Sequence, residues 1–203
     1  QKEEEEKVNK LKEWLTENKV SAGVNIDEDS KRYYPYSTLA SQVIGACGTD
    51  NQGLSGIEYS YDSILKGTSG EVVMSTDASK SEIPNSQESF IPAENGYNLT
   101  LTIDINIQSI VEKYLKEAVE ENACSKGGNC IIMDPKTGNI LAMASYPNYD
   151  LNSPFTPTSY YADNWDSLSN EEKNSRIYNM WHVRSVFETY EPGSVFKLIT
   201  ASV

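Results

Sequence analysis

Residues 97–145 read YNLTLTIDINIQSIVEKYLKEAVEENACSKGGNCIIMDPKTGNILAMAS, and this stretch decides the fold class. Leu99, Leu101 and Ile103 alternate with polar residues, which predicts a strand over residues 97–104. Apolar residues then recur at helical spacing up to residue 122. Two strand-like runs, NCIIMD and NILAMAS, follow, and the Pro and Gly of the PKTG between them favour a tight hairpin turn. Strand, helix and hairpin in this order predict an α+β fold.

The chain before this stretch predicts a separate, helical unit. An apolar stripe at spacings of three and four indicates an amphipathic helix over residues 2–18. Short helical pieces separated by glycines follow, the last of them ending at Gly67. The polar passage SKSEIPNSQESFIPAENG, residues 79–96, is predicted to be a loop at the boundary between two domains. We therefore expect one domain over residues 1–95 and a second over residues 96–203.

The stretch between the hairpin and the C-terminal motif is predicted to be a long surface excursion. Residues 147–174, PNYDLNSPFTPTSYYADNWDSLSNEEKN, are polar, aromatic and interrupted by proline. Long loops on a rigid scaffold often meet substrates, although many only cover the edge of a sheet.

Composition excludes several classes of function. A net charge of −13, from 17 basic and 30 acidic residues, argues against a nucleic-acid partner, because phosphate binding needs clustered Lys and Arg. No run approaches the roughly 20 apolar residues that cross a bilayer. Cys47, Cys124 and Cys130 are too few for a disulfide framework or a four-cysteine zinc site, and we expect no metal and no cofactor. A bridge between Cys124 and Cys130 stays open as the less favoured alternative to free thiols.

The last residues, TYEPGSVFKLITASV, carry the candidate chemistry. Ser194 lies three residues before Lys197 and just after Pro192 and Gly193, which predicts that it opens a buried helix. Positions i and i+3 share a helix face, so the lysine amine can reach the serine hydroxyl. A neutral lysine can take the serine proton, and free N–H groups in the first turn can help to hold an oxyanion. The motif therefore predicts a serine nucleophile with a lysine base, or, more plainly, an ordinary helix start.

Spacing alone decides little, because Ser-x-x-Lys occurs twice in the sequence. The second copy, Ser63 to Lys66, comes at the end of a helical piece, where a lysine suits the C-terminal carbonyls. His182 is the only histidine, and no acidic residue lies at a spacing that would indicate a catalytic pair. We therefore interpret it as a surface or packing residue.

Five blocks together resemble one protein family. YEPGSVFK resembles the first active-site motif of the class B penicillin-binding proteins, the monofunctional D,D-transpeptidases that cross-link peptidoglycan. RYYPYSTLASQVIG and GLSGIEYSYDSILKGTSGE resemble that family's non-catalytic pedestal, and LTIDINIQSIVEKYL and IIMDPKTGNILAMASYPNYDLN resemble the entry into its transpeptidase domain. These blocks follow the family's order and cover most of the chain from Gly23 onward.

The resemblance implies a mechanism and its ligands. Ser194 would attack a D-Ala-D-Ala stem peptide and form an acyl-enzyme that a second stem resolves, Lys197 would be the general base, and β-lactams would acylate the same serine. The family also uses a Ser-x-Asn motif, which is absent from the sequence, and a Lys-Thr-Gly motif after the nucleophile. The KTG at residues 136–138 precedes the nucleophile and falls in the predicted hairpin turn, so we interpret it as unrelated to the site.

The resemblance also implies a longer parent protein. We expect the remaining transpeptidase motifs and a membrane anchor to lie outside these residues, with the protein on the outer face of the bacterial cytoplasmic membrane. Taken alone, the 203 residues are expected to be inactive. Two alternatives stay open: a serine β-lactamase or penicillin-sensing receptor, which share the Ser-x-x-Lys helix, and a non-enzymatic scaffold that docks other cell-wall synthesis proteins through the pedestal.

Overall fold

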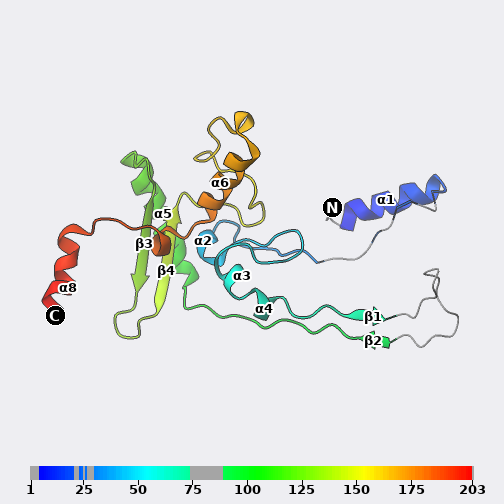
Figure 1. Cartoon of the computed structure of the whole chain (residues 1–203), viewed down its shortest axis with the longest axis horizontal. Coiled ribbons are helices and arrows are strands. Elements are labelled where there is room, and N and C mark those ends of the chain that lie inside the picture. The colour runs from blue at the N-terminus through cyan, green and yellow to red at the C-terminus, as the bar shows by residue number, and fades with distance from the viewer. Residues whose placement is uncertain (1–4, 21–22, 25, 27–29, 74–88, 203) are drawn as a thin grey trace.

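The computed structural model describes residues 5–20, 23–24, 26, 30–73 and 89–202. The helices and strands follow in the order α1 (Glu5–Glu17), α2 (Ser41–Ile44), α3 (Gly56–Ser60), α4 (Asp62–Leu65), β1 (Glu71–Val73), β2 (Ser89–Ile91), α5 (Ile105–Glu121), β3 (Gly128–Met133), β4 (Ile140–Tyr146), η1 (Trp165–Ser167), α6 (Asn170–Trp181), α7 (Arg184–Phe187), η2 (Gly193–Phe196) and α8 (Lys197–Ser202). Figure 1 shows the β1–β2 ribbon extending to one side of the molecule and α8 to the other. The α+β prediction is confirmed.

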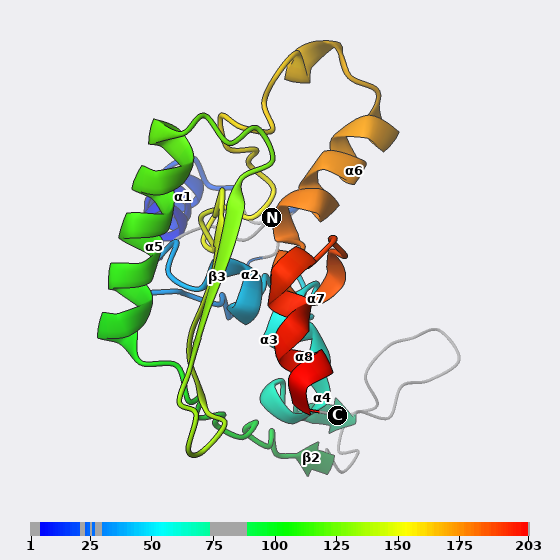
Figure 2. The ribbon, with the colours of Figure 1, turned by 90° about the vertical axis from the view of Figure 1, so that its left-hand side faces the viewer.

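Helix α5 packs against the β3–β4 hairpin, as the sequence predicts (Figure 2). The Asp104 carboxylate caps the helix by accepting hydrogen bonds from the backbone N–H groups of Asn106 and Ile107, at 2.8 and 3.0 Å. Val111 from α5 and Ala142 and Ala144 from β4 are the buried residues of this small core. Small alanines on the strand let the helix approach the sheet closely, and the pair forms the scaffold of the second half of the chain.

The hairpin turn carries the KTG sequence, as predicted. The Asp134 carboxylate accepts hydrogen bonds from the backbone N–H of Lys136, at 2.9 Å, and from the hydroxyl of Thr137, at 2.8 Å. Gly138 has a φ of +76°, a left-handed conformation that glycine adopts without strain. These bonds account for the turn by local chemistry, so the prediction that KTG falls in the hairpin turn is confirmed.

The predicted strand over residues 97–104 is wrong. The segment is extended, but a strand also needs a ladder of backbone hydrogen bonds to a neighbour. Next to β4 it makes one backbone bond, from the Asp104 N–H to the Leu141 carbonyl at 2.9 Å, and one side-chain bond, from Thr102 Oγ1 to the Ile140 carbonyl at 2.7 Å. Apolar and polar side chains do alternate along this segment, as they do in a strand. The segment lacks the ladder of backbone hydrogen bonds to a neighbouring strand.

The predicted loop over residues 79–96 needs a correction too. Residues 79–88 lie outside the described part of the chain, but residues 89–91 form β2 and pair antiparallel with β1. An isolated bridge between Thr68 and Glu94 continues the same ribbon. The pairing is long-range in sequence, so the polar composition of the segment gave no sign of it.

The predicted surface excursion over residues 147–174 is also wrong in its first part. Tyr149 and Leu151 are only 1% and 3% exposed, and they belong to a second core with Met180 and Trp181 of α6 and Tyr34 of the N-terminal half. The Trp181 indole N–H donates to the Pro154 carbonyl at 2.9 Å, which fastens the loop to α6. Helix α6 itself opens with a capping box between Ser169 and Glu172.

The N-terminal half confirms the predicted helices. Helix α1 matches the amphipathic stripe, although none of its side chains is buried. A buried carboxylate organises the short helices, because Glu58 accepts hydrogen bonds from Arg32 Nε at 2.7 Å and from the Tyr34 hydroxyl at 3.2 Å. All three cysteines are free, so the alternative of a bridge between Cys124 and Cys130 is not realised.

A polar cluster joins the two halves. Glu112 Oε1 of α5 accepts from the Ala40 backbone N–H and from Gln108 Nε2, both at 2.7 Å. Gln108 is fully buried and also exchanges two hydrogen bonds with the Met143 backbone, at 2.8 and 3.0 Å. The Gln42 side-chain amide donates to the Pro147 carbonyl at 2.8 Å. Because a buried polar group without a partner is costly, this network fixes how the halves meet.

We expect Glu112 to give this contact a distinctive pH dependence. Burial raises the pKa of the Glu112 carboxyl above its ordinary value of 4.5, although the bonds from Gln108 and Ala40 oppose the shift. A group with a raised folded-state pKa stabilises the fold fully below its unfolded pKa and loses that contribution as pH rises through the folded pKa. Urea unfolding of the wild type and of Glu112→Gln should therefore show a wild-type advantage that declines as pH rises from about 4.5. An advantage that grows with pH would contradict this assignment.

Candidate active site

Ser194 and Lys197 lie one short helical turn apart. The chain leaves α7 in an extended conformation, and Pro192 then leads into η2, where the Val195 N–H donates to the Pro192 carbonyl at 3.3 Å. The Lys197 N–H donates to the Ser194 carbonyl, and α8 begins at Lys197. Side chains at i and i+3 of a 3₁₀ turn are eclipsed, so the serine and the lysine lie on the same side of the segment.

The helix is not buried, which corrects one expectation. The sequence predicted a buried helix here, but residues 188–202 are exposed throughout, and the apolar side chains of Val195, Leu198 and Ile199 are 63%, 75% and 56% exposed. Val203 lies outside the described residues. Figure 1 shows the reason: the extended segment carries α8 away from the hairpin, and no described residue of η2 or α8 is buried. Hydroxyl and amine are thus open to solvent.

Gly193 sets the geometry at the start of η2. Its φ of +56° lies in the left-handed region, which residues with a Cβ adopt only with strain. Apart from the adjoining chain, no atom lies within 4 Å of where a Cβ would stand, so the backbone conformation, and not the close approach of another segment, is the requirement here.

Arg184 tethers the segment that leads to Ser194. From the first position of α7 its guanidinium donates to the Lys126 carbonyl, which lies between α5 and β3, and to the Tyr161 hydroxyl at 3.2 Å. Its Nε also lies 3.6 Å from a Glu188 carboxylate oxygen. Sequence reasoning missed this residue, because a single arginine between Val183 and Ser185 gives no signal of the distant carbonyl that it meets.

The competing residues lie elsewhere. Ser63 sits within α4, in the N-terminal half. His182 is exposed and packs edge-on against Phe187, with ring centroids 4.6 Å apart, which matches the packing role expected for it. Neither residue contacts Ser194 or Lys197 among the described hydrogen bonds and ring contacts, so the pair at the start of α8 stays the candidate site.

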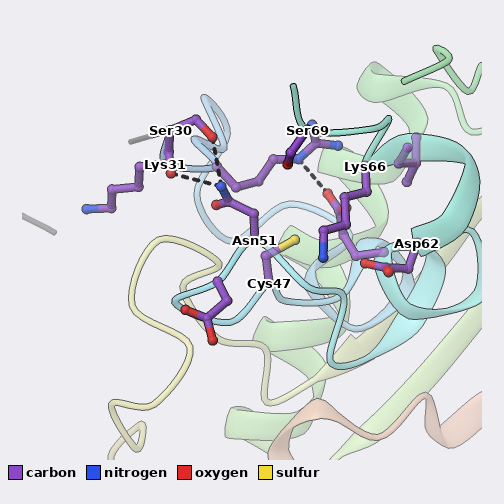
Figure 3. Close-up of a pocket in the computed structure, with 11 residues that line it drawn as sticks. Ser30, Lys31, Cys47, Asn51, Asp62, Lys66 and Ser69 are labelled. Carbon is purple, nitrogen blue, oxygen red and sulfur yellow. Dashed lines mark hydrogen bonds and ion pairs between the residues drawn. The ribbon is translucent and has the colours of Figure 1, made fainter. Parts of the chain in front are cut away.

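A cavity of about 370 Å³ opens in the N-terminal half (Figure 3). Arg32, Lys66, Glu58 and Asp62 line it, so both signs of charge are present, and none of its lining residues comes from the region of Ser194. Burial raises the pKa of the Cys47 thiol at its wall, partly opposed by a hydrogen bond with Tyr34, which keeps the thiol protonated and poorly nucleophilic. This cavity offers no chemistry to the C-terminal motif.

Within the described ranges, no group of three or more His, Cys, Asp and Glu side chains could hold a metal ion. No helix among the described residues is long and apolar enough to span a membrane.

Two family models match the chain. The penicillin-binding protein dimerisation domain matches residues 2–101, and the penicillin-binding protein transpeptidase domain matches residues 128–203. Ser194 and Lys197 fall within the second match.

Relatives in sequence and structure agree with these models. Stage V sporulation protein D of Bacillus subtilis is 38% identical over 88% of this chain and 25% of its own length. The peptidoglycan D,D-transpeptidase FtsI of Buchnera aphidicola subsp. Schizaphis graminum is 38% identical over 87% of this chain and 27% of its own length. In the complex of Helicobacter pylori PBP2 with MreC, a chain that is 28% identical aligns with a TM-score of 0.55, over 82% of this chain and 31% of that one.

The chain therefore spans about a quarter of the length of the curated relatives it matches. The five sequence blocks, the two domain models and the shared architecture agree in order along the chain. The chain belongs to the class B penicillin-binding proteins, with a dimerisation-domain segment followed by the start of a transpeptidase domain.

Proposed function

We propose that the protein is a peptidoglycan D,D-transpeptidase in which Ser194 is the nucleophile and Lys197 its general base. One observation carries the proposal: the two side chains lie on the same side of the turn that opens α8, inside the segment that the transpeptidase model matches. The D,D-transpeptidases among the relatives support the same reaction. The substrate is the D-Ala-D-Ala end of a stem peptide.

The reaction follows from the chemistry of the pair. Lys197, as the neutral amine, takes the hydroxyl proton of Ser194 while the serine oxygen bonds to the carbonyl carbon of the substrate. The C–N bond breaks, and the terminal D-Ala leaves as an amine with the proton that the lysine returns. An amine of a second stem then attacks the ester, its proton passes back through the lysine to the serine oxygen, and the cross-link is released. A β-lactam enters the first step, and its opened ring stays attached to the serine.

The solvent exposure of Ser194 and Lys197 means that the reaction needs further parts of the protein around them. A lysine amine is neutral near pH 7 only when burial or nearby positive charge disfavours its charged form. Both side chains are solvent-exposed in the described structure, so this environment must come from groups beyond the described residues. We accordingly assign the activity to the complete protein.

Mapping the site of acylation tests the proposal. We expect the full-length protein, treated with benzylpenicillin, digested and analysed by mass spectrometry, to carry the adduct on the peptide that contains Ser194. An adduct on any other peptide, or no adduct, would refute the assignment of the nucleophile. An adduct that forms at Ser194 and hydrolyses within seconds would instead identify a β-lactamase.

We further propose that the dimerisation-domain segment docks other cell-wall synthesis proteins. A relative of this fold has been solved in complex with MreC, which supports a protein-binding role beside the enzymatic one. We place the protein at the outer face of the cytoplasmic membrane, anchored by a segment outside these residues.

We place the boundary between the two domains after residue 95. The bridge between Thr68 and Glu94 and the hydrogen bond from the Tyr97 N–H to the Ile64 carbonyl, at 2.9 Å, hold the chain to the N-terminal half. From Thr102 onward the contacts go to β4. The contacts of the chain thus change from the N-terminal half to β4 between residues 97 and 102, which supports a domain boundary close to residue 95.

A further inference from the structure

Polar contacts attach the segment of Ser194 to the rest of the described structure through one residue. In the described part of the chain, every hydrogen bond and ion pair of residues 188–202 goes to another residue of that segment or to Arg184. The Glu188 N–H donates to the Arg184 carbonyl at 3.0 Å, and the Glu188 carboxylate lies 3.6 Å from Arg184 Nε. Arg184 is therefore the polar link between the scaffold and the turn that holds Ser194 and Lys197.

The guanidinium of Arg184 reaches a fixed point of the scaffold. It donates to the Lys126 carbonyl, in the short connection that joins α5 to β3. Backbone hydrogen bonds hold this connection: the Cys124 N–H donates to the Val119 carbonyl at 3.0 Å, and the Gly127 N–H donates to the Cys124 carbonyl at 2.9 Å. Because α5 and β3 both pack against β4, the acceptor carbonyl belongs to the packed scaffold and not to a free loop.

The surroundings of the guanidinium fit an arginine. Its second amino group donates to the Tyr161 hydroxyl at 3.2 Å. A Cβ at Gly127 would stand 2.9 Å from Arg184 Nη1 and 2.0 Å from the Tyr146 carbonyl oxygen, so the glycine leaves the room that both groups occupy. The Arg184 side chain is only 13% exposed, and a planar guanidinium held by two acceptors has little freedom to turn. The side chain thus fixes α7 in position and in orientation.

The stretch between α7 and the nucleophile acts as a lever. Residues 188–193 separate the end of α7 from Ser194. At about 3.3 Å per residue, these six residues span at most about 20 Å. A tilt of α7 by about 3° would displace the serine oxygen by about 1 Å over that length. Misplacing a reacting group by about 1 Å can slow a reaction by about 100-fold, so a small error in the placement of α7 would affect the chemistry.

We propose that Arg184 is a positioning residue for acylation: by holding α7 to the α5–β3 connection, it sets where Ser194 meets the carbonyl carbon of the substrate. This inference rests on the proposed function and extends it to a side chain that makes no described contact with Ser194 or Lys197. A residue that acts only through position affects the chemical step. It leaves the first, noncovalent complex with the β-lactam unchanged, because the groups that hold the ligand are unchanged.

Stopped-flow acylation of the full-length protein by a fluorescent penicillin separates these two effects. The dependence of the rate on penicillin concentration gives the dissociation constant of the noncovalent complex and the acylation rate constant. Arg184→Ala should lower the rate constant by about 10-fold to 100-fold and leave the dissociation constant unchanged. Arg184→Lys keeps one donor for the Lys126 carbonyl and should recover part of the rate.

Tyr161→Phe tests whether the effect passes through the contacts of the guanidinium. It removes only the hydroxyl that Arg184 binds and should slow acylation by about twofold to fivefold, the loss of one hydrogen bond. In the Arg184→Ala background the same change should have no further effect, because its partner is already gone. Additive losses would show that the two residues act independently, against the proposal.

Arg176 provides a matched control. It lies on α6, is half-buried like Arg184, and donates to the Tyr161 carbonyl at 3.0 Å and the Asp163 carbonyl at 2.5 Å. In the described structure it makes no hydrogen bond or ion pair with the α5–β3 connection or with residues 188–202. Arg176→Ala should therefore leave the acylation rate constant unchanged. An equal loss in Arg176→Ala and Arg184→Ala would assign the effect to general loosening near Tyr161 and overturn the proposal.

The remaining outcomes are equally decisive. An unchanged rate constant in Arg184→Ala would overturn the inference, and so would a raised dissociation constant with an unchanged rate constant, which would make Arg184 part of the ligand-binding surface. Should circular dichroism show that Arg184→Ala does not fold, wild-type rate constants in both Arg184→Lys and Tyr161→Phe would overturn it. No acylation of the wild type at Ser194 would refute the proposed function as well. Acylation at Ser194 that the Arg184 variants leave unchanged would refute this inference alone.

Discussion

Replacing Ser194 with alanine is expected to abolish covalent labelling of the full-length protein by a fluorescent penicillin. The substitution removes the only oxygen that the proposed mechanism uses to open the β-lactam ring, so no adduct can form. It should not disturb folding, because the Ser194 side chain is exposed and no neighbouring residue of η2 or α8 is buried. Gel fluorescence after labelling is the measurement, and unchanged circular dichroism confirms the fold.

Ser63 provides the matched control. It lies in the second Ser-x-x-Lys sequence, is also exposed and sits in a short helix of the N-terminal half. Ser63→Ala should label like the wild type. Undiminished labelling of Ser194→Ala, or loss of labelling in Ser63→Ala alone, would show that the serine in the C-terminal motif is not the nucleophile.

The second large effect is expected at Tyr149, which is 1% exposed in the core shared by both halves. Tyr149→Ala should lower the free energy of unfolding by about 3–5 kcal/mol, because removing a buried aromatic side chain loses apolar contact and leaves a cavity. Chemical denaturation followed by tryptophan fluorescence reports it, since Trp181 belongs to the same core.

Tyr149→Phe separates the ring from the hydroxyl. The hydroxyl donates to the Ser41 carbonyl at 3.2 Å, and losing that single bond should cost about 1 kcal/mol. If the two variants were equally unstable, the hydrogen bond and not the filled volume would be the main contribution of Tyr149. If neither variant were destabilised, the packing of residues 147–151 against the N-terminal half would be wrong.

Elements whose cause is local were predictable from the sequence. The period of apolar residues gave α1 and α5, and the PKTG sequence gave the turn between β3 and β4. The order of the sequence blocks gave the family. The Ser-x-x-Lys spacing marked two serines, and the resemblance of YEPGSVFK to the family's first active-site motif favoured Ser194 over Ser63.

Predictions failed where the answer lay in a distant segment. Residues 97–104 alternate like a strand and lack a ladder, while residues 89–91 look like loop and pair with β1. Gln108 could have been noticed as a polar residue beside the apolar face of α5, but its partners at Met143 are 35 residues away. The exposure of Ser194 likewise depends on what packs over α8, which spacing does not encode.

The sequence by itself determined the helices with a regular apolar period, the hairpin turn, the family and the residues proposed for catalysis. The helices and the turn depend on interactions within a few residues, which repeat wherever the same local pattern occurs. The family and the proposed catalytic residues came from the resemblance of sequence blocks along the chain. Only the tertiary structure decided that Tyr149 and Leu151 are buried, that Glu112 and Gln108 join the two halves, and that Arg184 meets the Lys126 carbonyl. Burial and partner choice depend on which remote segments share a surface, and that is a property of the whole packed chain.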